Sequence, residues 1–370
     1  MRIELLIDSL VSGGAQRQMV ELAVLLKKAG HDIRLLLYYD LDFFGDELRA
    51  ADVPVQLIQS KGKLSRILKV RAAIRARKPD AVIAYLSTPS ILAELAGLPR
   101  RKFAVIVTEL TGTTGVKRKG DALRFQFHRL ADAVVTNGQT LADFITREAS
   151  WLQGKVHVIV NCVDLERFCP PEQPERTDRL SIAVLARLQP VKNPLVLLRA
   201  VILLRDQHGI QAEVDWYGNR FYKDGRPTAL SSLYQELIAG IEAGNLSGLF
   251  RVHDPTTNVT PIYQNASLVC LPSLWEGMSN VICEALSCGR PMLASRVCDN
   301  ALLVHQGKNG YLFDPNDPQE LADRLYDFSR LSTEERKTMG AHSRAIAEGL
   351  MAPQLFVQRY VDLAASLQKQ

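Results

Sequence analysis

The 370-residue sequence lacks several patterns, and each absence excludes a class of protein. No run reaches the ~20 consecutive apolar residues that a membrane-spanning helix requires. Residues 1–10 predict a first strand rather than a signal peptide, because Glu4 and Asp8 break the apolar stretch. The six cysteines form no CxxC pair and have no histidine partners at zinc spacing. We therefore expect reduced, packed thiols in a cytoplasmic protein, and no zinc site.

Positive charge is concentrated in the first half of the chain. Residues 1–167 contain 25 Lys and Arg against 18 Asp and Glu, whereas residues 168–370 contain 20 against 22. The excess lies in two segments, from Lys61 to Lys78 and from Lys117 to Arg129, and the first has apolar residues at helical spacing. Such segments suit an anionic membrane surface or an anionic substrate. Nucleic acid is disfavoured because no binding motif accompanies the charge, and a core helix with a solvated basic face is the alternative for either segment alone.

Short apolar runs alternate with helix-like stretches along the whole chain. Strands are predicted at residues 2–7, 33–38, 55–58, 81–85, 103–108, 133–136, 156–160, 180–185, 212–216, 249–252, 268–271 and 291–294. Strands that are apolar throughout are typical of parallel sheets covered on both faces. The polar, Pro-rich segment 169–178 indicates a linker. We predict an α/β protein with two doubly wound parallel-sheet domains, each of which binds its ligand at the carboxyl ends of its strands.

The most informative pattern is a pair of glutamates, Glu276 and Glu284, on either side of a predicted helix start. The residues between them predict the end of a buried strand, a turn, and a helix with Ser279 or Asn280 as its N-cap. Backbone N–H groups at a helix N-terminus attract anions, and carboxylates accept hydrogen bonds from hydroxyls. A nucleotide-diphosphate sugar has the matching layout, with phosphates between two hydroxyl-rich rings. Two solvated surface acids are the alternative.

Other loops at predicted strand ends carry further candidate residues. Arg187 and Lys192 follow one strand, and a diphosphate would pair with both cations. A structural salt bridge from Arg187 to a neighbouring acid, one of the two glutamates included, is the alternative. Gly218 turns at the next strand end, where the chain could pass close to a nucleotide. Asn258 and Val259 precede a helix start whose backbone could contact a base.

Two consecutive glycines, Gly13 and Gly14, lie between the first predicted strand and the helix that follows. Glycines at such a place let backbone N–H groups approach a ligand closely. The spacing is not the G-x-G-x-x-G fingerprint, and no acid ends the second strand, so NAD binding is disfavoured. A plain tight turn explains the pair equally well.

Together these features resemble glycosyltransferase family 4, whose members have the GT-B fold. The residues that carry the resemblance are the Gly13-Gly14 turn, the Arg187 and Lys192 loop, the Glu276 and Glu284 pair, and residues 158–168 and 310–315. The resemblance spans nearly the whole chain and is most specific in the second domain. It implies two Rossmann-like domains that face a central cleft. Residues 1–167 would bind the acceptor, together with a C-terminal helix at 353–370 that returns to them, and residues 168–352 would bind the nucleotide-sugar donor.

The same resemblance implies roles for individual residues. Arg187 and Lys192 would bind the donor diphosphate and offset charge on the leaving group, while Glu276 would bind hydroxyls of the donor sugar; these three are the expected catalytic residues. The expected donor-binding residues are Gly13, Gly14, Gly218, Asn258, Val259, Met278, Ser279, Asn280 and, on the ribose, Glu284. The resemblance further implies hexosyl transfer with retention of anomeric configuration, without a metal or other cofactor. UDP is the expected nucleotide.

On the acceptor side the chain departs from the family pattern. Many family members carry a histidine in the loop after the strand at 103–108, but this loop begins with Glu109 and contains no histidine. Glu109 could contact the acceptor, although a solvated loop acid is the interpretation we favour. The expected acceptor is a glycan or a polyprenyl-linked saccharide of bacterial envelope polysaccharide or lipopolysaccharide assembly, met in the cytoplasm or on the inner face of the plasma membrane. A nucleotide-sugar epimerase of the same fold and a non-catalytic nucleotide-sugar or glycan-binding protein are the alternatives.

Overall fold

A computed structural model describes residues 1–110, 120–172, 179–218, 222–223, 226–227 and 230–368. The chain divides into two compact units. Unit 1 comprises Met1–Cys162 and Ala352–Gln370, and unit 2 comprises Val163–Met351. The domain border expected from the linker composition, after residue 167, lies a few residues further along the chain. The basic residues Lys117, Arg118 and Lys119, and the loop from Thr111 to Gly115, lie outside the described residues.

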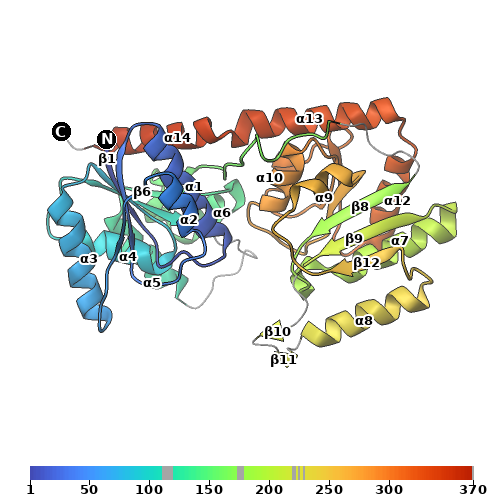
Figure 1. Cartoon of the computed structure of the whole chain (residues 1–370), viewed down its shortest axis with the longest axis horizontal. Helices are drawn as coiled ribbons and strands as arrows, with labels where there is room; N and C mark the ends of the chain where they lie inside the picture. Colours follow the sequence, from blue (N-terminus) through green and yellow to red (C-terminus); the bar gives the residue numbers. More distant parts are fainter. Residues whose placement is uncertain (111–119, 173–178, 219–221, 224–225, 228–229, 369–370) are drawn as a thin grey trace. The chain divides into compact units, whose positions relative to one another are not determined.

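Unit 1 is built on a parallel sheet (Figure 1). Its described strands have the order β3-β2-β1-β4-β5-β6-β7. The strands are β1 (Arg2–Leu6), β2 (Asp32–Leu37), β3 (Val55–Leu57), β4 (Ala81–Ala84), β5 (Ala104–Glu109), β6 (Ala133–Thr136) and β7 (Val156–Val158). Each coincides with a predicted apolar run, give or take about two residues at either end. The strand order reverses between β1 and β4, and doubly wound sheets bind ligands at the carboxyl ends beside such a reversal.

Helices cover both faces of this sheet. They are α1 (Gly14–Lys28), α2 (Gly45–Ala50), α3 (Lys63–Arg77), α4 (Ser87–Ala96), α5 (Asp121–Phe127), α6 (Gln139–Glu148) and α14 (Pro353–Ser366), with 3-10 turns η1 (His128–Leu130) and η2 (Ser150–Leu152). Successive strand residues point into different cores. Leu5 packs with residues of α1 and α14, whereas Leu6 packs with residues of α3, α4 and α6. The apolar character of both strand faces follows from this double cover.

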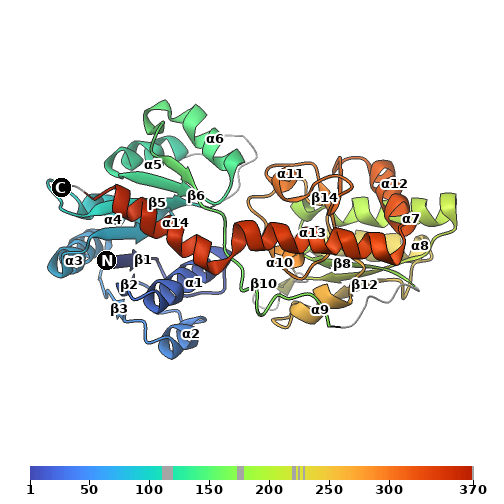
Figure 2. The ribbon, with the colours of Figure 1, turned by 90° about the horizontal axis from the view of Figure 1, so that it is seen from above.

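The C-terminal helix α14 belongs to unit 1, which confirms the predicted return of the chain. Figure 2 shows α14 lying over the sheet of unit 1 beside α1, and the two helices are in contact. Phe356 and Tyr360 of α14 are buried. The hydroxyl of Tyr360 lies 2.8 Å from that of Tyr85, which follows β4. The last helix therefore fills the core of the first domain with one apolar face.

Unit 2 contains a second parallel sheet, whose described strands have the order β12-β9-β8-β13-β14-β15 (Figure 1). The strands are β8 (Leu180–Leu185), β9 (Ala212–Tyr217), β12 (Phe250–His253), β13 (Leu268–Leu271), β14 (Met292–Ser295) and β15 (Gly310–Phe313). A short hairpin follows β9 and pairs β10 (Tyr222–Lys223) with β11 (Arg226–Pro227). The sequence does not predict β15, because a run of about four residues that opens with glycine fits a loop equally well.

The helices of unit 2 pack on this sheet. They are α7 (Pro194–His208), α8 (Leu230–Ala243), α9 (Thr260–Asn265), α10 (Asn280–Ser287), α11 (Asn300–Leu303), α12 (Pro318–Ser329) and α13 (Thr333–Met351), with the 3-10 turn η3 (Pro190–Lys192) after β8. Val184 of β8 and Trp216 of β9 are fully buried and pack with residues of α7 and α12. α10 packs against α13. Among the described residues, no helix has both the length and the apolar composition needed to span a bilayer.

The six cysteines are unpaired thiols, as the sequence predicts. Cys270 and Cys283 are fully buried in unit 2. Burial raises the pKa of Cys283 to about 12, so this thiol stays protonated at neutral pH. These cysteines therefore serve as small packing residues.

Candidate functional site

Lys192 and Glu276 meet at the carboxyl edge of the unit 2 sheet. Lys192 ends the turn η3 after β8, and Glu276 lies in the loop between β13 and α10. β8 and β13 are neighbouring parallel strands, so their carboxyl ends lie at the same edge. The Nζ atom of Lys192 lies 2.5 Å from Oε1 of Glu276, and Ser273 donates its hydroxyl to the same oxygen at 2.5 Å. The two charged side chains are 19% and 11% exposed, so solvent screens the pair only partly.

The helix after Glu276 presents its N-terminus at this edge. Ser279 occupies the N-cap position that the sequence predicts, but its side chain makes no capping hydrogen bond. Met278 and Ser279 are buried, and Asn280 is half-buried. First-turn N–H groups without a side-chain cap suit an anionic ligand. This sheet edge therefore holds both a cation and a helix N-terminus, a combination that suits a phosphate oxygen.

Glu284 lies further along α10, and a buried tyrosine holds its carboxylate. The hydroxyl of Tyr263, on α9, donates to Oε2 of Glu284 at 2.8 Å. Glu284 is 8% exposed and Tyr263 is fully buried. The alternative interpretation, two solvated surface acids, is therefore wrong for both glutamates. A carboxylate held in one orientation can accept hydrogen bonds from a pair of hydroxyls such as those of a ribose.

Arg187 is exposed, and among the described residues it has no ion-pair partner. The salt bridge to a glutamate that the sequence allows for Arg187 is made by Lys192 instead. The guanidinium of Arg187 is therefore available to an anion at the end of β8.

Gly218 allows the end of β9 to pack closely against the end of β8. A Cβ atom on Gly218 would lie 1.9 Å from the carbonyl oxygen of Ala186. The same oxygen accepts a hydrogen bond of 2.8 Å from the indole N–H of Trp216. Because the clash would be with backbone, which cannot rotate aside, only glycine fits here.

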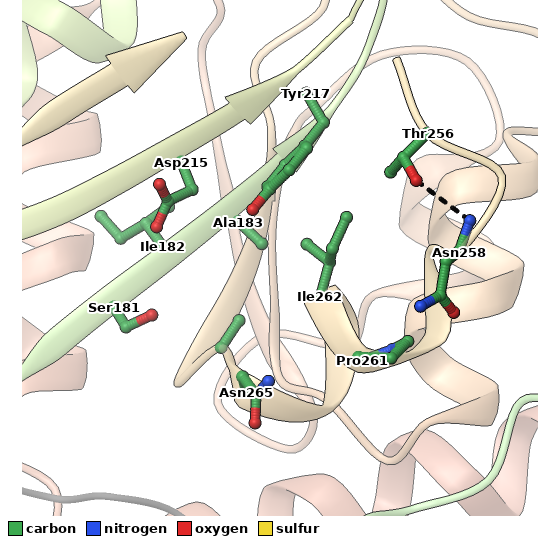
Figure 3. Close-up of a pocket in the computed structure, with 11 residues that line it drawn as sticks. Ser181, Ile182, Ala183, Asp215, Tyr217, Thr256, Asn258, Pro261, Ile262 and Asn265 are labelled. Carbon is green, nitrogen blue, oxygen red and sulfur yellow. Dashed lines mark hydrogen bonds between the residues drawn. The ribbon is translucent and has the colours of Figure 1, made fainter. Parts of the chain in front are cut away.

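A pocket of about 390 Å³ lies between β8, β9 and helix α9 (Figure 3). Its polar lining includes Asp215 and Tyr217 of β9 and Thr256 and Asn258 of the loop before α9. The ring of Tyr217 stacks on that of His253, with centroids 4.4 Å apart. Burial opposes ionisation of Asp215, but hydrogen bonds from Arg251 and His253 outweigh burial and lower its pKa. The pocket thus joins an aromatic stack to a charged carboxylate.

The structure separates this pocket from the two glutamates. Asn258 is the one predicted site residue in the described lining, and Lys192, Glu276 and Glu284 are not part of it. Val259 occupies the N-cap position of α9. The predicted donor residues of unit 2 therefore fall into two groups, one at the end of β13 and one before α9.

In unit 1, Gly13 and Gly14 lie between β1 and α1 as the sequence predicts. Gly13 is the N-cap of α1 with an extended backbone, and Gly14 is the first helical residue and is exposed. A Cβ atom on Gly13 would lie 2.4 Å from Oε1 of Gln16. That atom ends a flexible side chain, so the backbone geometry of the turn does not itself require glycine.

Glu109 is not a solvated loop acid, the interpretation that its place in the sequence favours. It is the last residue of β5 and is 5% exposed. His128 Nε2 lies 3.0 Å from its Oε1 atom, and Arg124 Nε lies 2.7 Å from the same atom. The interpretation is wrong because the strand runs one residue further than its apolar letters suggest, and α5 and η1 then cover the carboxylate.

Several residues at these edges are missing from the sequence-based set. Ser273, Tyr263 and His128 each hold one of the named carboxylates. Ser273 lies three residues before Glu276, and this short spacing is a local signal for a contact between the two side chains. Tyr263 and His128 come from other elements, and neither periodicity nor spacing links them to their partners.

The two described cations of the second basic segment, Arg124 and Arg129, make contacts inside unit 1. Arg124 pairs with Glu109 and with Asp121, and the guanidinium of Arg129 lies 4.7 Å from the ring centroid of Trp151. These contacts leave α3 as the stronger candidate for an anion-binding surface.

Acidic residues near the start of the chain include one Asp-x-Asp triplet, Asp40-Leu41-Asp42. Asp42 forms an ion pair of 3.0 Å with Arg49. The part of the chain that the structure describes contains no group of three or more His, Cys, Asp or Glu side chains arranged to hold a metal ion.

Comparisons with known protein families agree with this architecture. The model for Glycosyltransferase Family 4 matches residues 12–167, and the model for Glycosyl transferases group 1 matches residues 179–330. Together they span most of both units. The chain belongs to the family 4, group 1 glycosyltransferases.

Individual relatives are more distant. The chain is 33% identical over 182 residues to a D-inositol 3-phosphate glycosyltransferase of Corynebacterium jeikeium, covering 46% of this chain and 42% of that protein. Its alignments span about half the length of several such relatives. It is 26% identical over 340 residues to the UDP-Gal:alpha-D-GlcNAc-diphosphoundecaprenol alpha-1,3-galactosyltransferase of Escherichia coli, covering 84% of each chain. The crystal structure of Anabaena HepE in complex with UDP superposes with a TM-score of 0.84 at 19% identity, covering 99% of this chain and 100% of that chain, which confirms the GT-B fold.

Proposed function

We propose that this protein is a retaining hexosyltransferase that moves a sugar from a nucleotide-diphosphate sugar to a glycan or a lipid-linked saccharide. The observation that carries the proposal is the contact between Lys192 and Glu276 at the sheet edge where α10 begins. A cation, a carboxylate and a helix N-terminus match the phosphates and hydroxyls of such a donor. The UDP-Gal-dependent relative and the UDP bound to HepE support UDP as the nucleotide.

The charges at this edge suggest how the donor reacts. When the bond between the anomeric carbon and the phosphate oxygen breaks, negative charge develops on that oxygen, and Arg187, Lys192 and the helix N-terminus would stabilise it. Lys192 has three N–H donors, so it can bind phosphate while it still contacts Glu276. Glu276 would accept hydrogen bonds from the donor sugar, and Glu284 from the ribose.

Retention follows in this proposal from attack on the face that the nucleotide leaves. The acceptor oxygen bonds to the anomeric carbon, the carbon–phosphate oxygen bond breaks, and the acceptor proton passes to the leaving phosphate oxygen. Two cations and a helix N-terminus supply positive charge for the diphosphate, so the proposed reaction requires no metal. Product stereochemistry, determined by NMR, and activity in the presence of a chelator test these two points.

The decisive variant is Glu276→Gln. We expect release of UDP from UDP-galactose, with a lipid-tailed GlcNAc diphosphate as acceptor, to fall at least about 100-fold, because a contact that strengthens in the transition state is lost. Affinity for UDP should change little. Glu213→Gln is the matched control: Glu213 is 19% exposed and pairs with Arg179 at 2.7 Å near the amino end of β9, and this variant should keep its activity.

The outcomes separate the alternatives. Wild-type protein that binds UDP-sugars but releases no UDP with any donor and acceptor of a panel would be a binding protein rather than a transferase. Interconversion of the donor sugar without transfer would identify an epimerase. An unchanged rate in Glu276→Gln would contradict the assigned role of this residue.

The surface of α3 supports an acceptor that is held at an anionic membrane. α3 contains no Asp or Glu and carries Lys or Arg along its whole length. The sequence assigns Leu64 and Leu68 to the apolar stripe of this helix, but they are 70% and 57% exposed, and α3 buries only Val70 and Ile74. Exposed leucines among cations are typical of helices that lie in a membrane interface.

A neighbouring loop extends this surface. Tyr39, Leu41 and Phe43 are exposed after β2. The guanidinium of Arg66, on α3, lies 4.4 Å from the ring centroid of Tyr38 and donates to the hydroxyl of Tyr39 at 3.2 Å. The loop and the helix therefore present their apolar side chains as one connected surface, which would place the protein on the inner face of the plasma membrane.

Vesicle sedimentation tests this surface. Binding to vesicles that contain phosphatidylglycerol should fall steeply with added NaCl. Leu64→Ser combined with Leu68→Ser should weaken it, whereas Leu302→Ser, at a leucine of unit 2 that is 53% exposed, should not. Absent or salt-insensitive binding would show that α3 is an ordinary solvated helix and not a membrane-binding surface.

A further inference from the structure

A buried chain of charged side chains runs beneath the carboxyl end of β5. His128, from η1, lies between two glutamates: its Nδ1 atom is 2.7 Å from Oε1 of Glu94 on α4, and its Nε2 atom is 3.0 Å from Oε1 of Glu109. Arg124 of α5 continues the chain, with contacts of 2.7 Å to Glu109 and 2.9 Å to Asp121. Three carboxylates and two cations therefore meet at one end of the sheet.

The exposed fraction of these side chains increases along this series of contacts. His128 and Glu94 have no exposed side-chain surface, Glu109 and Asp121 are 6% exposed, and Arg124 is 25% exposed. This series of contacting side chains thus runs from the core under α4 to the surface at the carboxyl edge of the sheet. Parallel sheets bind ligands at this edge, and β5 lies next to β4, beside the reversal of strand order.

Burial of this many charges is costly, and apolar replacements are often more stable. A second buried carboxylate in the same sheet shows how a purely structural pair is arranged. Glu4 is fully buried, and Arg34 donates to each of its two oxygens at 2.8 Å. At the carboxyl edge, by contrast, both cations contact one oxygen of Glu109, and within the described residues no donor is placed on its Oε2 atom. Among the described residues, Oε2 of Glu94 is buried and has no hydrogen-bond partner.

The protonation states follow from the same contacts. Burial would lower the pKa of His128, but hydrogen bonds to Glu109 and Glu94 outweigh burial and raise the pKa to about 9. The protonated ring therefore donates to both glutamates at neutral pH. The same series of contacts includes Asp121 and Arg124 of α5, and the charge of Arg101 acts on Glu94.

We infer that Glu109 is the hydroxyl-binding anchor for the acceptor saccharide, and that His128, backed by Glu94, is the positioning residue that keeps this carboxylate oriented. The free lone pairs of Glu109 accept hydrogen bonds from acceptor hydroxyls, which are good donors to a carboxylate. The inference rests on the proposed function, and it names a saccharide with adjacent hydroxyls as the ligand of unit 1. Glu109 touches the acceptor, whereas His128 and Glu94 act through it.

Steady-state kinetics with UDP-galactose and the lipid-tailed GlcNAc diphosphate test this assignment. Glu109→Gln and His128→Gln should each raise the acceptor KM about tenfold or more, the effect of losing a charge-assisted hydrogen bond. The KM for the donor and the calorimetric Kd of UDP should stay within about twofold. Glu94→Gln, which keeps the shape of the side chain, provides a second variant should His128→Gln fold poorly.

Two controls distinguish positioning from a merely structural role. Glu4→Gln removes an equally buried carboxylate of the same unit and should lower the melting temperature without changing the acceptor KM. In wild type, the acceptor KM should rise as the pH passes about 9, where His128 loses its proton, and this rise should be absent in His128→Gln. An acceptor KM unchanged in both Glu109→Gln and His128→Gln would overturn the inference.

Direct binding separates this inference from the proposed reaction. Calorimetric titration of the same GlcNAc diphosphate into the UDP-bound protein needs no turnover. If the wild type binds the saccharide but transfers nothing, and Glu109→Gln loses this binding, the proposed function is contradicted and the role of Glu109 as anchor is supported. If the wild type transfers the sugar and Glu109→Gln binds the saccharide as tightly as the wild type does, the proposed function is supported and the role of Glu109 as anchor is contradicted.

Discussion

Lys192 Nζ and Glu276 Oε1 lie 2.5 Å apart although 84 residues separate them in the chain. The contact exists because β8 and β13 are neighbours in the sheet and each residue follows the carboxyl end of its strand. It holds the glutamate in one orientation before any donor arrives. Preorganised charge of this kind lowers the cost of ordering a site at the moment of reaction.

Lys192→Met should weaken UDP binding by about 10- to 100-fold, the range expected for a lost charge-assisted hydrogen bond to phosphate. It should also destabilise unit 2, because the mostly buried carboxyl group of Glu276 loses its ion-pair partner. Isothermal titration with UDP measures the first effect and thermal unfolding the second. Lys308→Met, at an exposed lysine of the same unit, is the control and should change neither the affinity for UDP nor the stability of unit 2.

Gly218→Ala should distort the junction of β8 and β9. The added Cβ atom would lie 1.9 Å from the carbonyl oxygen of Ala186, so the strands must shift, at a cost of about 1–3 kcal/mol. UDP affinity should fall as well, because Arg187 follows Ala186 directly. Gly349→Ala is the matched substitution: Gly349 lies in α13 with no atom within 4 Å of the added Cβ, and alanine there should be neutral or stabilising.

Tyr360→Ala tests how firmly α14 belongs to unit 1. The ring is buried and its hydroxyl is 2.8 Å from that of Tyr85, so truncation should cost about 3–5 kcal/mol. Calorimetric unfolding should show the loss in the transition of unit 1, with that of unit 2 unchanged. Leu355→Ala, on the same helix at a residue 38% exposed, should have a small effect; equal losses for both variants would contradict the assigned packing.

The stability of unit 1 should decline in mild alkali. The pKa of His128 is raised in the folded protein to about 9 from its ordinary 6.5. Its proton therefore stabilises the fold fully below pH 6.5, and this contribution, about 3 kcal/mol by the ordinary conversion, is lost as the pH rises through 9. Burial also raises the pKa of Glu94, so its ionisation lowers the stability of the fold as the pH rises, in the same direction but on the acidic side.

Urea unfolding across this pH range measures the effect. The stability difference between wild type and His128→Gln should be largest below about pH 6.5 and should shrink as the pH rises through about 9. A difference that does not depend on pH would mean that the ring is neutral in the fold.

The fold was accessible from the sequence because its determinants are local. A strand such as β8 is a continuous apolar run, and α12 begins at a proline with Asp317 as its cap. The strand β15 escaped prediction because its four residues open with Gly310 and gain their strand character from pairing with β14. For a related reason the sequence predicts that β5 ends one residue early: Glu109 belongs to the strand because it pairs with Thr136 of β6.

By itself the sequence determined which residues stand at strand ends. In parallel sheets one edge collects all carboxyl ends, so Arg187, Lys192 and Glu276 could be assigned to a common edge from chain order alone. Only the tertiary structure decided which of them pair. It joined Glu276 to Lys192 rather than to Arg187, and it placed His128 beneath Glu109. Such contacts depend on distances between elements far apart in the chain, which local periodicity and composition do not encode.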